Sequence, residues 1–327
     1  MSRSTAILLT SYNRPELIEL QLKALLEVEG ANVFVSIDRD QQGNINSEIK
    51  DLSVGKYSSF AWVFQENKLG VGGHILFMVT RLLSEFDNCI VIEDDVKISK
   101  KVLISGMNLL STKLPKDCLT IGFFGAMPYN LLTRILFGRN KWRKTEYFSA
   151  WGWGTQSEVW KKYSPFLDET KFDEELQRSS LWQKKGQESK VRWTRRFKVV
   201  ADSPKFTWDF QMAYATYKEG CFHLLPTYRS VENLGLNDIR STNTKTQRPR
   251  WIFGQAQGAE IGTGIDLDSF RQRILESLGK VTWAGDSDLF PQMNNMRRKV
   301  KSFLGFVARI KIKSNNVLRI LFRFRKL

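Results

Sequence analysis

Cys89-Ile90-Val91-Ile92-Glu93-Asp94-Asp95 decides the fold, because four apolar residues are followed directly by three carboxylates. A short apolar run of this kind is typical of an interior strand of a parallel sheet, and such sheets bind ligands at the carboxyl ends of their strands. Clustered carboxylates suit Mg2+ or Mn2+, which fill their remaining positions with water and substrate phosphates. The stretch therefore indicates a site for a nucleotide or a nucleotide-linked donor. A solvated strand end is the alternative.

The first half of the chain alternates apolar runs with helical patterns. We expect strands at 6–10, 32–37, 59–64 and 89–92, and helices at 15–27 and 75–83. This alternation predicts an α/β fold with a doubly wound, mainly parallel sheet and helices on both faces. Beyond residue 120 the alternation weakens. The segments 119–124 and 147–149 are candidate strands there, and long loops are expected elsewhere.

The net charge of +16 is concentrated near the C-terminus. Residues 297–327 contain eleven Lys and Arg residues and no acidic residue, which leaves +5 for the rest of the 327 residues. Phe303, Phe306, Val307 and Ile310 recur at helical spacing, as in an amphipathic helix that lies in a membrane interface. We therefore expect an anionic membrane surface as a partner, in preference to nucleic acid. A tail helix packed on the domain is the alternative.

Composition predicts one large domain at 1–285 and a basic amphipathic tail at 286–327. The domain would divide into a nucleotide-binding half, 1–118, and an acceptor and catalytic half, 119–285. The first apolar stretch, 6–9, is too short for a signal peptide or a membrane span. Three widely separated cysteines fit neither a disulfide framework nor a zinc site. We expect a cytoplasmic protein that is peripheral on the inner face of the cell membrane.

Other polar and aromatic residues are candidates for the site. Arg14 follows the first strand, and a solvent-facing arginine is its alternative role. Asp209, between Trp208 and Phe210, is the best candidate for a general base, although an Asp at a helix N-terminus would also satisfy backbone donors. Trp153, flanked by glycines, could stack on a sugar or pack in the core. Both histidines are left out of the metal site because neither has a spaced partner.

Several short motifs, in order along the chain, resemble nucleotide-sugar glycosyltransferases of the GT-A fold. The opening Ile-Leu-Leu-Thr-Ser-Tyr-Asn-Arg-Pro at 7–15 is similar to the start of many family 2 transferases, and 66–73, which includes Gly70, resembles their donor-binding loop. The pattern is also similar to the N-acetylglucosaminyltransferase I family. That similarity runs through four segments, 36–38, 91–95, 148–160 and 206–209. The resemblance covers roughly residues 6–235, in short motifs only.

The resemblance implies roles on the donor side of the site. It assigns Arg14 to the donor and Asp38 to the uracil base. Within the acidic triplet it assigns Asp95 to direct coordination of Mn2+. Glu93 and Asp94 would serve the ribose and the metal-bound water.

The resemblance also implies a catalytic pair, Trp208-Asp209. The Asp of this pair would remove a proton from the acceptor hydroxyl in an inverting displacement. The family continues with a second Asp where this chain has Phe210. That departure leaves the base assignment open.

Together these features predict a metal-dependent, inverting glycosyltransferase, either a hexosyl- or an N-acetylhexosaminyl-transferase. The departing diphosphate of a UDP-sugar needs a cation such as Mn2+ or Mg2+ to neutralise its charge. The acceptor would be a hydroxyl of a glycan or lipid-linked glycan in bacterial surface polysaccharide synthesis, and UDP-N-acetylglucosamine is implied by the resemblance alone. A nucleotidyltransferase and a non-enzymatic protein that binds anionic membranes or nucleic acid are the alternatives.

Overall fold

The structure, a computed structural model, describes residues 4–125, 142–163, 172–203, 207–228 and 230–235. They all belong to the first of the two units into which the chain divides, Met1–Ile265. The predicted boundary between residues 285 and 286 lies outside the described residues, as does the basic tail. Both therefore stay predictions. Within the described ranges, no helix is long and apolar enough to cross a membrane.

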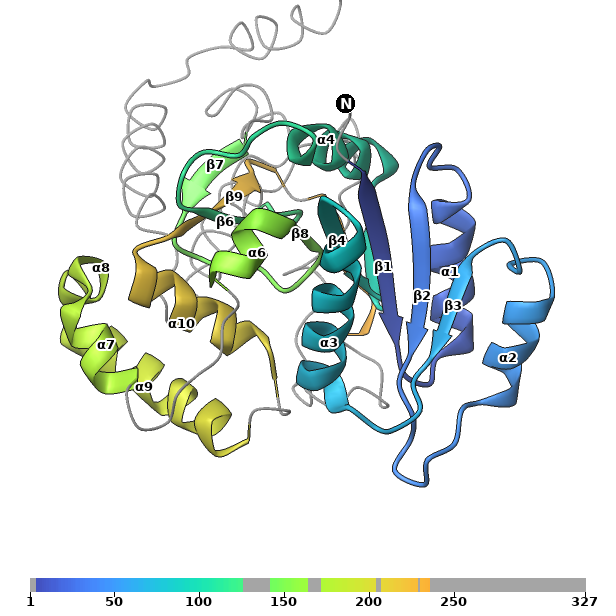
Figure 1. Cartoon of the computed structure of the whole chain (residues 1–327), viewed down its shortest axis with the longest axis horizontal. Coiled ribbons are helices and arrows are strands. Elements are labelled where there is room, and N and C mark those ends of the chain that lie inside the picture. Colours follow the sequence, from blue (N-terminus) through green and yellow to red (C-terminus); the bar gives the residue numbers. More distant parts are fainter. Residues whose placement is uncertain (1–3, 126–141, 164–171, 204–206, 229, 236–327) are drawn as a thin grey trace, which may run out of the picture. The chain divides into compact units, whose positions relative to one another are not determined.

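An eight-stranded mixed sheet forms the centre of the described chain (Figure 1). Its strands are β1 (Thr5–Ser11), β2 (Asn32–Ile37), β3 (Ala61–Phe64), β4 (Asn88–Glu93), β6 (Cys118–Gly122), β7 (Trp142–Thr145), β8 (Trp153–Gln156) and β9 (Phe222–Pro226). Their order in the sheet is β3-β2-β1-β4-β8-β6-β9-β7. The first four are parallel, as are β6 and β9. β8 is antiparallel to both of its neighbours, and β7 is antiparallel to β9.

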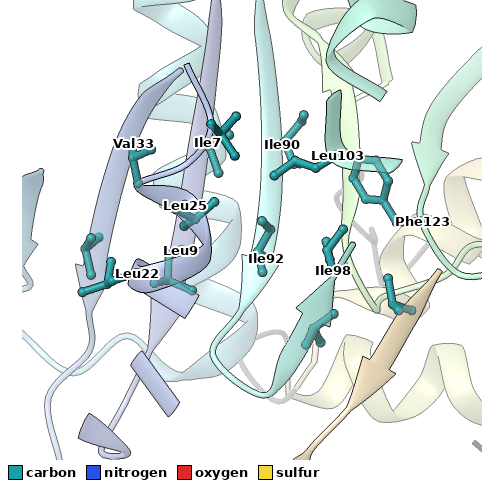
Figure 2. Close-up of a cluster of buried hydrophobic side chains, with 14 of the residues drawn as sticks. Ile7, Leu9, Leu22, Leu25, Val33, Ile90, Ile92, Ile98, Leu103 and Phe123 are labelled. Carbon is teal, nitrogen blue, oxygen red and sulfur yellow. The ribbon is translucent and has the colours of Figure 1, made fainter. Parts of the chain in front are cut away.

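Helices cover both faces of the sheet. They are α1 (Pro15–Leu25), α2 (Ser47–Val54), α3 (Gly70–Glu85), α4 (Lys100–Leu110), α6 (Ser157–Tyr163), α7 (Phe172–Arg178), α8 (Ser180–Gln183), α9 (Gln187–Asp202) and α10 (Asp209–Glu219). Successive side chains of a strand point to opposite faces, so β1 and β4 serve two cores. Ile7, Leu9, Ile90 and Ile92 pack with α1 and α4 (Figure 2). Ala6, Leu8, Cys89 and Val91 pack with α3, α6 and α10.

This double burial explains why the central strands read as unbroken apolar runs. The predicted α/β class, with a mainly parallel sheet and helices on both faces, is confirmed. Pro15 occupies the first turn of α1, where its missing N–H costs no hydrogen bond. Asp209 lies at a helix N-terminus, because α10 begins there, and the C-cap of α10 is Gly220 with a φ of +66°.

The second half of the chain departs from several sequence predictions. The strand predicted at 147–149 is wrong, since the strand in this region is β7. Trp153 and the glycine that follows it belong to β8. Its Gly154 lets α4 approach closely, because a Cβ there would lie 2.8 Å from Leu110 Cδ1. The basic stretch 182–200 lies mostly in α9, whose Trp193, Phe197 and Val200 are buried.

A buried histidine on β9 ties the sheet to α10. His223 Nδ1 lies 2.7 Å from Thr120 Oγ1, and its Nε2 lies 2.8 Å from Thr216 Oγ1. Burial lowers the pKa of His223 from 6.5 to about 3, because the charged imidazolium would be removed from water. The folded protein therefore holds this side chain neutral.

We predict that His223 makes the folded state sensitive to acid. Below pH 6.5 His223 binds a proton in the unfolded chain but stays neutral in the folded chain. The free energy of unfolding therefore decreases as the pH falls towards 3. Between pH 7 and pH 5 this amounts to about 2 kcal/mol. Urea unfolding at pH 7 and pH 5 should show a smaller decrease in the free energy of unfolding for His223→Asn than for the native chain. Equal losses would contradict the assignment.

Candidate functional site

The candidate site lies at the point where the order of the strands reverses. The chain runs from β1 outward to β2 and β3, and then returns to β4 on the other side of β1. Parallel sheets bind ligands in the crevice at the carboxyl ends of strands at such a switch point. Thr10 of β1 lies opposite Glu93 of β4, and the N–H of Asp94 donates to the carbonyl of Thr10 at 3.0 Å. The triplet and the loop after β1 therefore meet.

Asp94 is buried and bonded on both of its carboxylate oxygens. Arg14 forms a salt bridge with Oδ1 through Nη2, and its Nε donates to Oδ2 at 3.3 Å. The Ser11 hydroxyl also donates to Oδ2, and Gln21 Nε2 donates to the backbone carbonyl of Asp94 at 2.9 Å. Burial raises the pKa of Asp94 to about 6, against the attraction of Arg14. Both oxygens are thus committed to protein groups, and a role at metal-bound water stays a prediction.

Asp95 shares the same guanidinium but lies closer to solvent. Arg14 Nη1 is 3.2 Å from Asp95 Oδ2, and the Asp95 side chain is 16% exposed, compared with 2% for Asp94. The short strand β5 (Val96–Ile98) follows directly and pairs with β10 (Val231–Asn233) in a separate two-stranded sheet. Asp95 is therefore held by two segments. Arg14 contacts its carboxylate, and the N–H of Leu234, directly after β10, donates to its backbone carbonyl.

Glu93 and Asp209 come together from distant parts of the sequence. Burial raises the pKa of Glu93 well above its usual value, and the nearby carboxylates of Asp95, Asp94 and Asp209 raise it further. Asp209 is the first residue of α10 and accepts hydrogen bonds from the Thr207 hydroxyl and, at 3.0 Å, from the N–H of Phe210. The fold therefore places the predicted base near the predicted donor site.

The pKa of Asp209 is set by opposing effects. Burial raises it, whereas the Thr207 hydrogen bond, backbone N–H groups and the charge of Arg196 lower it, and the balance is a raised pKa. Arg196 belongs to α9, and its guanidinium carbon lies 4.7 Å from the Trp193 ring centre and 5.4 Å from that of Phe210. Carboxylates that transfer protons in enzymes commonly have a pKa that burial has raised.

Trp153 and Trp208 lie in the core beneath Asp209. Their rings stack at 5.0 Å, and Phe148 packs edge-on against both. Because Trp153 is 0% exposed and Trp208 is 3% exposed, neither presents an open ring face to a ligand. Trp153 therefore packs in the core, which was the alternative to stacking on a sugar. The stack fixes the chain where α10 begins, and so acts on Asp209.

Asp38 and Gly70 meet at the start of α3. The N–H groups of Leu69 and Gly70 donate to the Asp38 carboxylate at 2.9 and 2.8 Å, and that of Arg39 donates at 2.9 Å. A carboxylate at a helix N-terminus satisfies unpaired N–H groups and complements the helix dipole. This explains why α3 begins at Gly70, five residues before the predicted start. Contact with a uracil base remains a prediction for Asp38.

Sequence reasoning missed three residues of this site. Ser11 and Tyr12 lie inside the opening motif, and Tyr12 is 40% exposed near the carboxylates of Asp38 and Asp40. Gln21 is a polar residue on the buried side of α1, next to Leu22 and one turn after Ile18. That polar interruption of an apolar helix face was the available signal.

The residues present fit a cation that is completed by its substrate. Among the described residues, no group of three or more His, Cys, Asp and Glu side chains is arranged to hold a metal ion by itself. Mg2+-type sites, however, often use one or two carboxylates together with substrate phosphates and water. Asp95 is accessible and lies in a cluster of carboxylates whose mutual repulsion already raises the pKa of Glu93. Such a cluster attracts a cation.

Comparison with known proteins gives likenesses of structure only. No protein-family model matches the chain, and no curated protein matches it. Similar solved structures include a mannosyltransferase from Pyrobaculum calidifontis in complex with GDP-Man and Mn2+, at 12% identity and a TM-score of 0.36, over 50% of this chain and 47% of that one. Another is TarS 1–349 from S. aureus, at 11% identity and a TM-score of 0.38, over 70% and 59% of the two chains.

A third similar structure is glucosyl-3-phosphoglycerate synthase from Mycobacterium tuberculosis in complex with Mn2+, UDP and glucosyl-3-phosphoglycerate. It is 13% identical, with a TM-score of 0.33, over 48% of this chain and 57% of that one. This chain spans about half the length of the first structures that it matches. The case for the function of this chain rests on its own residues.

We predict that Arg14→Met is strongly destabilising, because it leaves Asp94 buried without its counter-ion. Removing one partner of a buried ion pair costs about 3–5 kcal/mol in the free energy of unfolding. Urea unfolding at pH 8, where Asp94 is ionised, should show this loss, and the added substitution Asp94→Asn should restore much of it.

Lys23→Met is the control for Arg14→Met. Lys23 forms an exposed ion pair with Glu19, at 2.9 Å, and both residues belong to α1. Exposed pairs contribute little, so its unfolding curve should stay close to that of the native chain. If Arg14→Met were as mild as this control, the central role of the buried pair would be refuted.

Proposed function

We propose that this chain is a metal-dependent, inverting glycosyltransferase that moves a sugar from a UDP-sugar to a hydroxyl group. The observation that supports it is the proximity of Asp209 to the acidic triplet, at the switch point among the parallel strands of the sheet. Two carboxylate functions are needed, one for a donor-bound cation and one for the acceptor proton. Asp95 and Asp209 supply them from separate segments, and their unequal environments fit unequal roles.

On the donor side, Asp95 would hold the cation, and Glu93 would bind the ribose. A bound Mn2+ or Mg2+ would neutralise the charge that develops on the departing diphosphate. Asp38 and the exposed ring of Tyr12 lie near each other at the ends of β1 and β2, where the base of the nucleotide would bind. Arg14, held by Asp94, would place its positive charge beside the diphosphate.

On the acceptor side, Asp209 would remove the proton of the attacking hydroxyl. The oxygen would then form a bond to the anomeric carbon while the bond to the diphosphate breaks on the opposite face, which inverts the configuration. The pKa of Asp209, raised by burial, makes this carboxylate a better proton acceptor than an exposed one. Thr207 and the backbone N–H of Phe210 would fix its orientation.

We further propose that the acceptor is a glycan or lipid-linked glycan and that the protein works at the inner face of a bacterial membrane. The support is the basic, amphipathic sequence of residues 297–327, which suits an anionic lipid surface. UDP-N-acetylglucosamine is the donor that we would test first. A panel of nucleotide sugars with Mn2+ and Mg2+ would identify the donor by turnover.

Two substitutions should separate the two halves of the site. Asp95→Asn should weaken Mn2+-dependent binding of the UDP-sugar more than about 100-fold, because it removes a metal ligand. Asp209→Asn should leave that binding intact and reduce transfer about 10²- to 10⁴-fold, the usual contribution of a general base. Calorimetry with donor and Mn2+ measures the first effect, and product formation measures the second.

Either of two results would contradict the proposal. Unchanged Mn2+-dependent binding in Asp95→Asn would remove the metal assignment, and full transfer activity in Asp209→Asn would remove the base.

For the membrane, we predict that a chain ending at residue 296 no longer sediments with vesicles that contain anionic lipid, while it still binds the donor. The reason is that the deletion removes eleven basic residues and their apolar neighbours. Vesicles of neutral lipid serve as the control. Undiminished sedimentation of the shortened chain would show that the tail is not the membrane anchor.

A further inference from the structure

Gly235 lies against the carboxylate of Asp95. A Cβ atom built on Gly235 would be 2.2 Å from Asp95 Oδ2, 3.0 Å from its Cγ and 3.1 Å from its Cβ. The same Oδ2 atom is 3.2 Å from Arg14 Nη1. This oxygen therefore has Arg14 as a hydrogen-bond donor, and a side chain at position 235 would enter its space.

Hydrogen bonds hold the backbone on the N-terminal side of Gly235. Asn233 lies opposite Val96 in the β5–β10 pair, and the N–H of Leu234 donates to the carbonyl of Asp95 at 2.7 Å. The N–H of Gly235 itself donates to Asn233 Oδ1 at 2.9 Å. These hydrogen bonds hold the residues directly after β10 beside Asp95.

We propose that Gly235 is a positioning residue for Asp95: the absence of a side chain there lets the Asp95 carboxylate keep the rotamer in which it meets Arg14 and can bind a cation. This inference rests on the proposed function in taking Asp95 as the metal ligand. A side chain at 235 would displace the Asp95 carboxylate, which lies at the end of a side chain that can rotate, before it displaced the backbone. The cost would therefore fall on ligand geometry and not on the fold.

The test compares Gly235→Ala with Gly186→Ala, since a Cβ at Gly186 would have no heavy atom within 4 Å. Titration of each full-length protein with Mn2+ in the presence of UDP, followed by electron paramagnetic resonance, should show about tenfold weaker Mn2+ binding for Gly235→Ala only. Thermal unfolding should be nearly unchanged in both. If Gly235→Ala bound Mn2+ as tightly as the native chain, the positioning role would be wrong.

A crystal structure of Gly235→Ala makes the test independent of the metal. We expect Asp95 Oδ2 to have left its position beside Arg14, whereas an Asp95 carboxylate that has not moved would overturn the inference. Failure of the proposed function looks different. In that case the native chain would bind no Mn2+ in the presence of UDP, or Asp95→Asn would bind it normally, while the displacement of Asp95 in Gly235→Ala would persist.

Discussion

The ion pair between Arg14 and Asp94 is the interaction on which the site depends. Asp94 is buried at the end of β4, where an isolated carboxylate would be costly, and Arg14 and Ser11 from the end of β1 satisfy it. This pair joins the two strands that flank the switch point of the sheet. It also fixes the guanidinium beside Asp95, the residue we assign to the metal. Asp94 thus acts on Asp95 through the guanidinium that both share.

The first half of the fold could be predicted from the sequence because its central strands, β1 and β4, are buried on both faces. The apolar runs and the helices between them predict β1 to β4 and a mainly parallel sheet, whereas α2 and the order of the strands come from the structure alone. The second half could not be predicted in this way. β8 contains Gly154 and polar residues, and α9 is strongly basic. Their places depend on contacts with α4 and with the aromatic core, which no local pattern records.

The site shows the same division. The triplet, Arg14 and Asp209 could be identified from residue types and from a resemblance, but their meeting depends on the tertiary fold. Asp209 reaches Glu93 because the stacked Trp153 and Trp208 fix the start of α10. The use of Asp94 as an internal counter-ion was not visible, since three adjacent carboxylates look equivalent in sequence. Burial and the position of Arg14 distinguish Asp94 from Asp95.

The central claim is that Asp95 binds the cation that a nucleotide diphosphate completes. Crystals grown with Mn2+ and UDP, measured at a wavelength where manganese scatters anomalously, test this claim most directly. The account predicts a manganese peak within coordination distance of the Asp95 carboxylate and of the diphosphate, with Arg14 still paired to Asp94. A manganese peak far from Asp95, or bound UDP without any metal at the triplet, would contradict it.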